Sequence, residues 1–204
     1  MIYPHGVLVR LWAYLEPFDR GSRFEDPLSS ALEAAGLGHV TGGGSQLRPN
    51  GEIEFAEIEL GLANLDDALE IVRTVLEGAG APAGSELVFV RDGVRHDERI
   101  GTTECLAIYL DGVGLPDEVY ATSDLAEWVE RLDAALAARG AAVLASWTGP
   151  EETAVYAFGP NAESMYEAAH ETLATFPLCQ NARVVVRQGN PELLPRTIRL
   201  PRWQ

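Results

Sequence analysis

Alternating apolar and polar positions predict the same order of elements twice along the chain. Residues 7–92 and residues 105–188 each run strand, helix, strand, strand, helix, strand. The first strand shows the two-residue period of a half-buried strand, with one face made of Val7, Val9, Leu11, Ala13 and Leu15. A repeated unit of this kind predicts an architecture and leaves the surface chemistry open.

Capping residues mark the predicted helices in both passes. Asp26 followed by Pro27 begins the first helix, and Asn64 and Asn161 begin the second helix of each pass. Between the second and third strands of the first pass, the glycine-rich stretch 42–51 predicts a long hairpin loop. The second pass has only a short turn at the matching place, over 148–151.

This order of elements resembles the ferredoxin-like βαββαβ fold, duplicated over nearly the whole chain. The resemblance implies an α+β protein in which each antiparallel sheet has the strand order 4-1-3-2 and carries its helices on one face. We expect a first ferredoxin-like unit over 1–93, a polar linker over 94–104, a second unit over 105–189, and a C-terminal tail over 190–204 that wraps the body. The fold hosts many unrelated activities, so it implies no function.

Composition narrows the range of partners. The 204 residues include 31 Asp and Glu against 15 basic residues, all of them arginine, for a formal charge of −16. Binding to a nucleic-acid backbone is disfavoured because it requires cationic side chains. A basic protein is the natural electrostatic partner, although acidity also simply confers solubility. No apolar run is long enough for a membrane helix and the first residues lack a signal-peptide pattern, so we expect a cytoplasmic protein without membrane contact.

The two cysteines are predicted to be free thiols. Cys105 begins the first strand of the second pass, and Cys179 precedes its last strand. In a βαββαβ sheet these strands are antiparallel neighbours, so their first residues lie at opposite ends, beyond the reach of a disulfide.

No catalytic residue, cofactor site or metal site is predicted. The glycine run at 42–44 lacks the following helix and the lysine of a phosphate-binding loop. The histidines His5, His39, His96 and His170 lack the spacing of metal ligands.

The acidic strand over 51–60 supplies the candidate binding residues. Strict alternation places Glu52 and Glu54 on one face and Glu57 and Glu59 on the other, whereas a one-residue bulge at Ala56 would bring all four together. That bulge would turn Ile53, Phe55, Ile58 and Leu60 inward.

In the expected sheet order this strand lies beside the first one, whose helix-free face carries Arg10, Trp12 and Tyr14. Tryptophan, tyrosine and arginine are the residue types that dominate binding hot spots. We therefore expect a partner-binding surface made of these three residues and the four glutamates, unless the face packs against the second half or only meets water.

These observations favour a non-enzymatic binding protein. Its most concrete form is an intracellular inhibitor that neutralises a basic toxin or nuclease, in the manner of bacterial immunity proteins. Two alternatives stay open: a small-molecule-sensing regulatory protein with a ligand site between its halves, and a small enzyme whose site lies at the crease between them.

Overall fold

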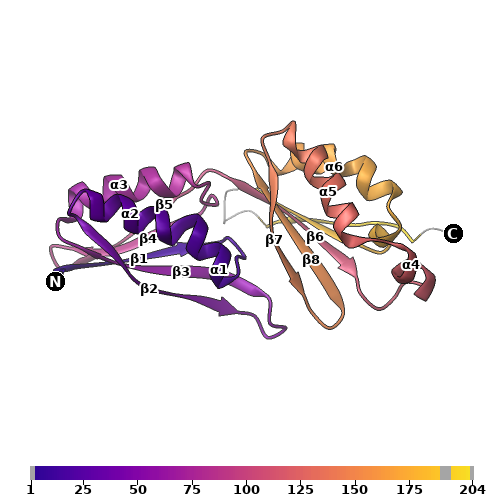
Figure 1. The fold of residues 1–204 in the computed structure, drawn as a ribbon, viewed down its shortest axis with the longest axis horizontal. Coiled ribbons are helices and arrows are strands. Elements are labelled where there is room, and N and C mark those ends of the chain that lie inside the picture. Colours follow the sequence, from indigo (N-terminus) through magenta and orange to yellow (C-terminus); the bar gives the residue numbers. More distant parts are fainter. Residues whose placement is uncertain (1–2, 189–193, 203–204) are drawn as a thin grey trace. The chain divides into compact units, whose positions relative to one another are not determined.

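The computed structural model describes residues 3–188 and 194–202, and the chain divides into two compact units, Met1–Thr102 and Thr103–Gln204. Each unit is a five-stranded antiparallel sheet with its longer helices on one face (Figure 1). The protein is therefore a tandem ferredoxin-like α+β protein, as the sequence predicted.

The first unit contains strands β1 to β5 and helices on one side of them. Its elements in chain order are β1 (His5–Leu11), α1 (Pro17–Arg20), the π-helix η1 (Gly21–Glu25), α2 (Asp26–Ala34), β2 (Gly38–Leu47), β3 (Ile53–Leu62), α3 (Leu65–Gly78), β4 (Ser85–Arg91) and β5 (Val94–Ile100). Helical structure thus begins ten residues earlier than the sequence pattern predicted, at Pro17 and not at Pro27, and the fixed φ of Pro17 suits a first helical position.

The second unit repeats this order with its own additions. Its elements are β6 (Glu104–Asp111), α4 (Asp117–Thr122), α5 (Leu125–Ala137), β7 (Ala142–Thr148), β8 (Glu152–Gly159), α6 (Ala162–Thr175), the 3₁₀-helix η2 (Pro177–Cys179), β9 (Arg183–Arg187) and β10 (Arg196–Arg199). Helix α4 and η2 had no counterpart in the predicted pattern.

The sheet order of both units confirms the predicted arrangement and extends it by one strand. The orders are β2-β3-β1-β4-β5 and β7-β8-β6-β9-β10, so each fourth strand gains an antiparallel neighbour. The predicted polar linker over 94–104 was wrong, because most of it forms β5. The predicted tail over 190–204 contributes the other added strand, β10. The parts of that tail at 190–193 and 203–204 lie outside the described residues.

A tight turn explains why residues 94–100 return to the sheet. Asp92 and Gly93 both have positive φ, 53° and 75°, as a two-residue type I′ hairpin turn requires. Val94 then lies opposite Arg91 and Ile100 opposite Ser85. The charged residues of β5 suit an edge strand, since charge discourages edge-to-edge association.

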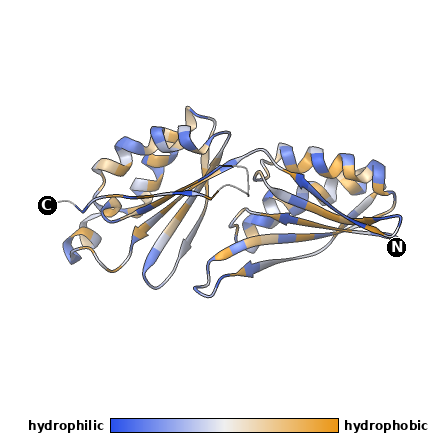
Figure 2. Ribbon diagram, turned by 180° about the vertical axis from the view of Figure 1, so that it is seen from behind, coloured by the Kyte–Doolittle hydropathy of each residue, from blue (hydrophilic) through white to orange (hydrophobic). Residues whose placement is uncertain are grey.

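Apolar side chains fill the space between each sheet and its helices. In the first unit, Val9, Leu11 and Ile58 of the sheet and Leu32 and Leu69 of the helices are fully buried. Hydrophilic and hydrophobic residues alternate along the helices (Figure 2), as expected for helices with one side on a core.

The predicted hairpin loop over 42–51 was wrong in its first half, which belongs to strand β2. The strand continues through the three glycines to Leu47 and pairs with β3 along its length. A Cβ at Gly43 would lie 2.8 Å from Glu25 Oε1 and 2.9 Å from the Glu57 carbonyl oxygen, so the bare backbone is required there. The buried Arg20 binds Glu25 at 2.6 Å and donates to the Gly44 carbonyl at 2.8 Å, which holds η1 against this strand.

Both cysteines are free thiols, as predicted, and the structure buries both. Cys179 lies in η2, among the residues packed between the second sheet and its helices. Burial raises the pKa of its thiol to about 12, although the neighbouring Trp128 acts in the opposite direction. Within the described part of the chain, no helix combines the length and apolar character needed to cross a bilayer.

Candidate functional site

The helix-free side of the first sheet brings together several of the predicted binding residues. We call this surface the open face. Cross-strand neighbours share a side of the sheet, and they define this face. It includes Leu8, Arg10 and Trp12 from β1 and its end, Gly42, Gly44 and Gln46 from β2, Phe55, Glu57 and Glu59 from β3, Glu86, Val88 and Val90 from β4, and Arg95, Asp97 and Arg99 from β5.

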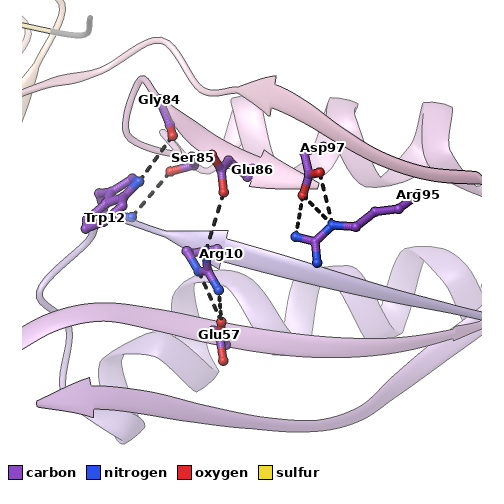
Figure 3. Close-up of polar contacts among 8 residues, drawn as sticks. All are labelled: Arg10, Trp12, Glu57, Gly84, Ser85, Glu86, Arg95 and Asp97. Carbon is purple, nitrogen blue, oxygen red and sulfur yellow. Dashed lines mark hydrogen bonds and ion pairs between the residues drawn. The ribbon is translucent and has the colours of Figure 1, made fainter. Parts of the chain in front are cut away.

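Arg10 lies at the centre of the open face and links three strands. Its Nη2 and Nε atoms donate to Glu57 Oε1 at 2.8 and 3.1 Å, and Nη1 lies 3.6 Å from Glu86 Oε2 (Figure 3). The guanidinium also covers the ring of Phe55, with 4.7 Å between Cζ and the ring centroid. Roughly 30% of each charged side chain stays exposed, at 29% for Arg10, 31% for Glu57 and 29% for Glu86.

Trp12 is held in a fixed orientation beside this cluster. Its indole N–H donates to the Gly84 carbonyl at 3.2 Å, and its backbone N–H lies 3.4 Å from Ser85 Oγ (Figure 3). Its ring meets Phe55 edge-on, with 5.4 Å between centroids. The ring is only partly buried, so an ordered aromatic surface is presented beside an arginine.

The bulge in β3 lies before Phe55, and alternation is unbroken from Phe55 to Leu60. Gln46 lies opposite Phe55 and Leu47 opposite Ile53, so Glu54 is the extra residue and not Ala56 as predicted. Ala56 consequently points to the core, fully buried opposite Leu11, and Phe55 points to the open face. The predicted inward position of Phe55 was therefore wrong.

Three of the predicted binding residues lie away from the open face. Tyr14 lies beyond the end of β1 and is buried. Its neighbours Ala13 and Leu15 are buried too, so buried and exposed positions no longer alternate there. Glu52 is also buried, in the β2–β3 hairpin, where it lies 3.3 Å from Arg48. Glu54 lies at the bulge, 4.0 Å from the same arginine. Arg10, Trp12, Glu57 and Glu59 are brought together, whereas these three are not.

Phe55 and Glu86 belong to the cluster and were missed from the sequence. Glu86 could have been identified, since it shares its strand face with Val88 and Val90 and the expected sheet order places that strand next to β1. Phe55 could also have been identified, because strict alternation places it on the face of Glu57 and Glu59, and only the bulge considered at Ala56 turned it inward.

The charge of the open face is nearly balanced. Its carboxylates are Glu57, Glu59, Glu86 and Asp97, and its arginines are Arg10, Arg95 and Arg99. The Arg95 guanidinium donates hydrogen bonds to Asp97 and so lowers the pKa of that carboxyl. Much of the net acidity lies instead on helices, including exposed residues such as Asp67, Glu70 and Glu77 of α3.

The middle of the corresponding side of the second sheet is more deeply buried. Its small and aromatic side chains are at most 5% exposed; they are Cys105, Ala107, Tyr109, Ala154, Tyr156, Phe158 and Val185. Arg183 lies opposite Tyr109 on this side, with its Cζ 3.7 Å from the ring centroid, and 26% of its side chain is exposed. Tyr109 and Tyr156 pack edge-to-face with centroids 6.2 Å apart. Both sheets thus carry a partly exposed arginine over an aromatic ring on this side, and they differ in how deeply the side chains around it are buried.

A shallow depression of about 390 Å³ lies at the end of β6, beside Asp111 and Asn181. Burial raises the pKa of Asp111, but hydrogen bonds from the N–H groups of Gly114 and Val113 and from Asn181 outweigh it, so the pKa lies below its ordinary value. The carboxylate already accepts these three hydrogen bonds, and two of them hold the loop that follows β6 in place. Among residues 3–188 and 194–202, no three His, Cys, Asp or Glu side chains are grouped to hold a metal ion.

Comparisons with known proteins give likeness of fold and no more. No protein-family model matches the chain, and a search of curated proteins found no match. Similar solved structures include an unknown protein from Galdieria sulphuraria, 17% identical, covering 90% of this chain and 97% of that one, with a TM-score of 0.28. The ligand-free regulatory subunit of aspartate kinase from Thermus thermophilus is 18% identical, covering 83% of this chain and 93% of that one, with a TM-score of 0.28. TM-scores this low carry no argument about function.

Proposed function

We propose that this protein binds a basic protein partner through the open face of its first unit and acts as an inhibitor, in the manner of bacterial immunity proteins. A single observation carries the proposal: Trp12, Phe55 and Arg10 form one ordered, partly exposed cluster that extends from the centre of the open face to the end of β1. Aromatic and arginine side chains held in place before binding lose little entropy on association.

Two parts of the surface contribute to binding in different ways, one to the affinity and the other to the rate of encounter. The open face itself is nearly neutral, so its contribution to affinity comes from the aromatic and arginine contacts. The acidic helices contribute a long-range field that attracts a basic protein and speeds encounter, an effect that salt weakens. A cytoplasmic site of action belongs to the same proposal and accords with the two free cysteines.

The test compares two aromatic substitutions in the first unit. Trp12→Ala removes a ring of the cluster, and Phe18→Ala removes an aromatic ring from α1 that is 84% exposed and outside the open face. Both variants are expected to stay folded, and Trp12→Ala should weaken binding of the partner captured from the native cell lysate by about 2 kcal/mol or more. Phe18→Ala should bind like the wild type.

Equal binding by the two variants would refute the proposal. If Trp12→Ala instead unfolds the first unit, the milder Trp12→Phe keeps a ring and loses the N–H donor to Gly84, so its binding is compared with that of Phe18→Ala.

A further inference from the structure

We propose that the open face contains a receptor for one lysine or arginine side chain of the partner, at the end of the sheet away from Trp12. This inference rests on the proposed function and names the chemistry that the partner must present. The receptor is a depression of about 400 Å³ over β1, lined by Leu8, Thr41, Glu59, Val88, Val90 and Arg95.

The depression exists because small residues leave room beside larger ones. Gly6 lies two residues before Leu8 on the same side of β1, and no atom lies within 4 Å of the position where its Cβ would stand. Leu8 lies opposite Val88 on one side and Glu59 on the other. The floor is therefore apolar, and one wall carries a carboxylate.

Glu59 differs from the other carboxylates of the open face in its partners. Glu57 and Glu86 share Arg10, and Asp97 is paired with Arg95. The exposed Glu59 makes no ion pair with any residue that the structure describes. Its carboxylate leans toward β2, where Oε2 lies 3.2 Å from the position of a Cβ on Gly42.

Arg95 on the opposite wall does not cancel this charge. Its Nε and Nη2 atoms donate to the Asp97 carboxylate at 3.0 and 2.6 Å, so the pair is close to neutral as a unit. The depression thus combines an apolar floor with one uncompensated negative charge. Lysine and arginine match both features, because their hydrocarbon stems pack on apolar surface while their charged ends reach a carboxylate.

Other occupants fit less well. An anion would meet Glu59, and a purely apolar side chain would remove that carboxylate from water without giving it a partner. If a second copy of this chain filled the depression, the protein would dimerise without any added ligand, and the test below includes this outcome.

The test uses a defined probe, the peptide acetyl-Gly-Arg-Val-Arg-Gly-amide, and a second peptide in which neutral citrulline replaces both arginines. Each is titrated into the full-length, ¹⁵N-labelled protein at low salt, and amide chemical shifts give the binding site and Kd. We expect the shifts to concentrate at Leu8, Glu59 and Val88, and the citrulline peptide to bind about tenfold more weakly.

Three variants complete the experiment. Glu59→Gln removes the charge and Gly6→Val fills the hollow, and each should weaken the arginine peptide about tenfold. Glu77→Gln removes an exposed charge on the helix side and should change Kd by less than about twofold. Circular dichroism melts confirm that the three variants remain folded; should Gly6→Val unfold, Gly6→Ala takes its place.

The inference is overturned if shifts occur elsewhere, if the citrulline peptide binds equally well, or if Glu59→Gln and Glu77→Gln have the same effect. It is also overturned if sedimentation shows that the protein alone dimerises and that Glu59→Gln abolishes the dimer. Trp12→Ala separates this outcome from the proposed function, because it should weaken the partner complex and leave the peptide titration unchanged. The peptide titration can therefore fail while the partner complex still depends on Trp12, and the reverse can also occur.

Discussion

Replacing Arg10 by methionine should destabilise the first unit by about 1–1.5 kcal/mol, because methionine keeps most of the stem and loses the guanidinium. Two contacts make up that figure. The partly exposed ion pair with Glu57 contributes about 0.5–1 kcal/mol, since roughly 30% of each side chain still meets water. The contact with the Phe55 ring adds about 0.5 kcal/mol at this exposure.

A double-mutant cycle isolates the ion pair from the rest. Urea unfolding is measured for the wild type, Arg10→Met, Glu57→Gln and the double variant at pH 7, and the coupling energy should be about 0.5–1 kcal/mol. The same cycle with Glu86 should give a smaller coupling, because that contact is 3.6 Å long and beyond hydrogen-bond distance. Salt near 1 M, where the Debye length is about 3 Å, should reduce both values.

The Arg95–Asp97 pair provides a matched control on the same face. Its side chains are 64% and 45% exposed, so its coupling energy should be close to zero despite shorter contacts. The reasoning is refuted if the Arg10–Glu57 coupling is no larger than that of the control. A coupling above about 3 kcal/mol would also refute it, since only a fully buried pair behaves in that way.

Three further predictions concern stability and reactivity. Asn64→Ala should cost about 1 kcal/mol in urea unfolding, because the side chain accepts hydrogen bonds from the N–H groups of Asp66 and Asp67, the second and third residues of α3; Asn64→Asp, which keeps an acceptor, should cost much less. Hydrogen bonding from Arg73 lowers the pKa of Glu98 below its ordinary value of 4.5, so this carboxyl stabilises the fold above that pH and loses its contribution as the pH falls through the lowered pKa. Wild type and Glu98→Gln should accordingly converge in melting temperature in acid, and a constant difference between pH 7 and pH 3 would contradict this. Cys105 and Cys179 should both react with a thiol reagent in the denatured, unreduced protein, whereas Cys179 should resist labelling in the native protein near pH 8 because its pKa is about 12.

The fold could be predicted because every element of the repeat carries its own local signal. The alternation around Val9, the Asn caps at 64 and 161, and the apolar faces of the helices are set by residues close together in sequence. The fifth strand was also within reach, since Asp92-Gly93 is a hairpin signal and the residues after it can continue in the strand conformation. Taking residues 94–104 as a linker gave too much weight to their charge.

The candidate site could be predicted only in part, because its make-up depends on register. Moving the bulge in β3 by two residues, from Ala56 to Glu54, turns Phe55 from the core to the open face, and both placements satisfy the same apolar pattern. The choice is made by packing: Ala56 suits the buried position opposite Leu11. The three glycines at 42–44 likewise indicated a loop until the buried Arg20 and Glu25 were found against them.

The most direct test of a binding role for the open face is carboxyl footprinting of the complex between this protein and the partner captured from native lysate. Glycine ethyl ester labels exposed carboxylates, and mass spectrometry compares their labelling rates in the free and bound protein. The account predicts that binding protects Glu59 and Glu57 and leaves Glu77 on the outer side of α3 unchanged. Protection of Glu77 with unaltered labelling of Glu59 would contradict it, because the partner would then be bound on the helices and not on the open face of the sheet.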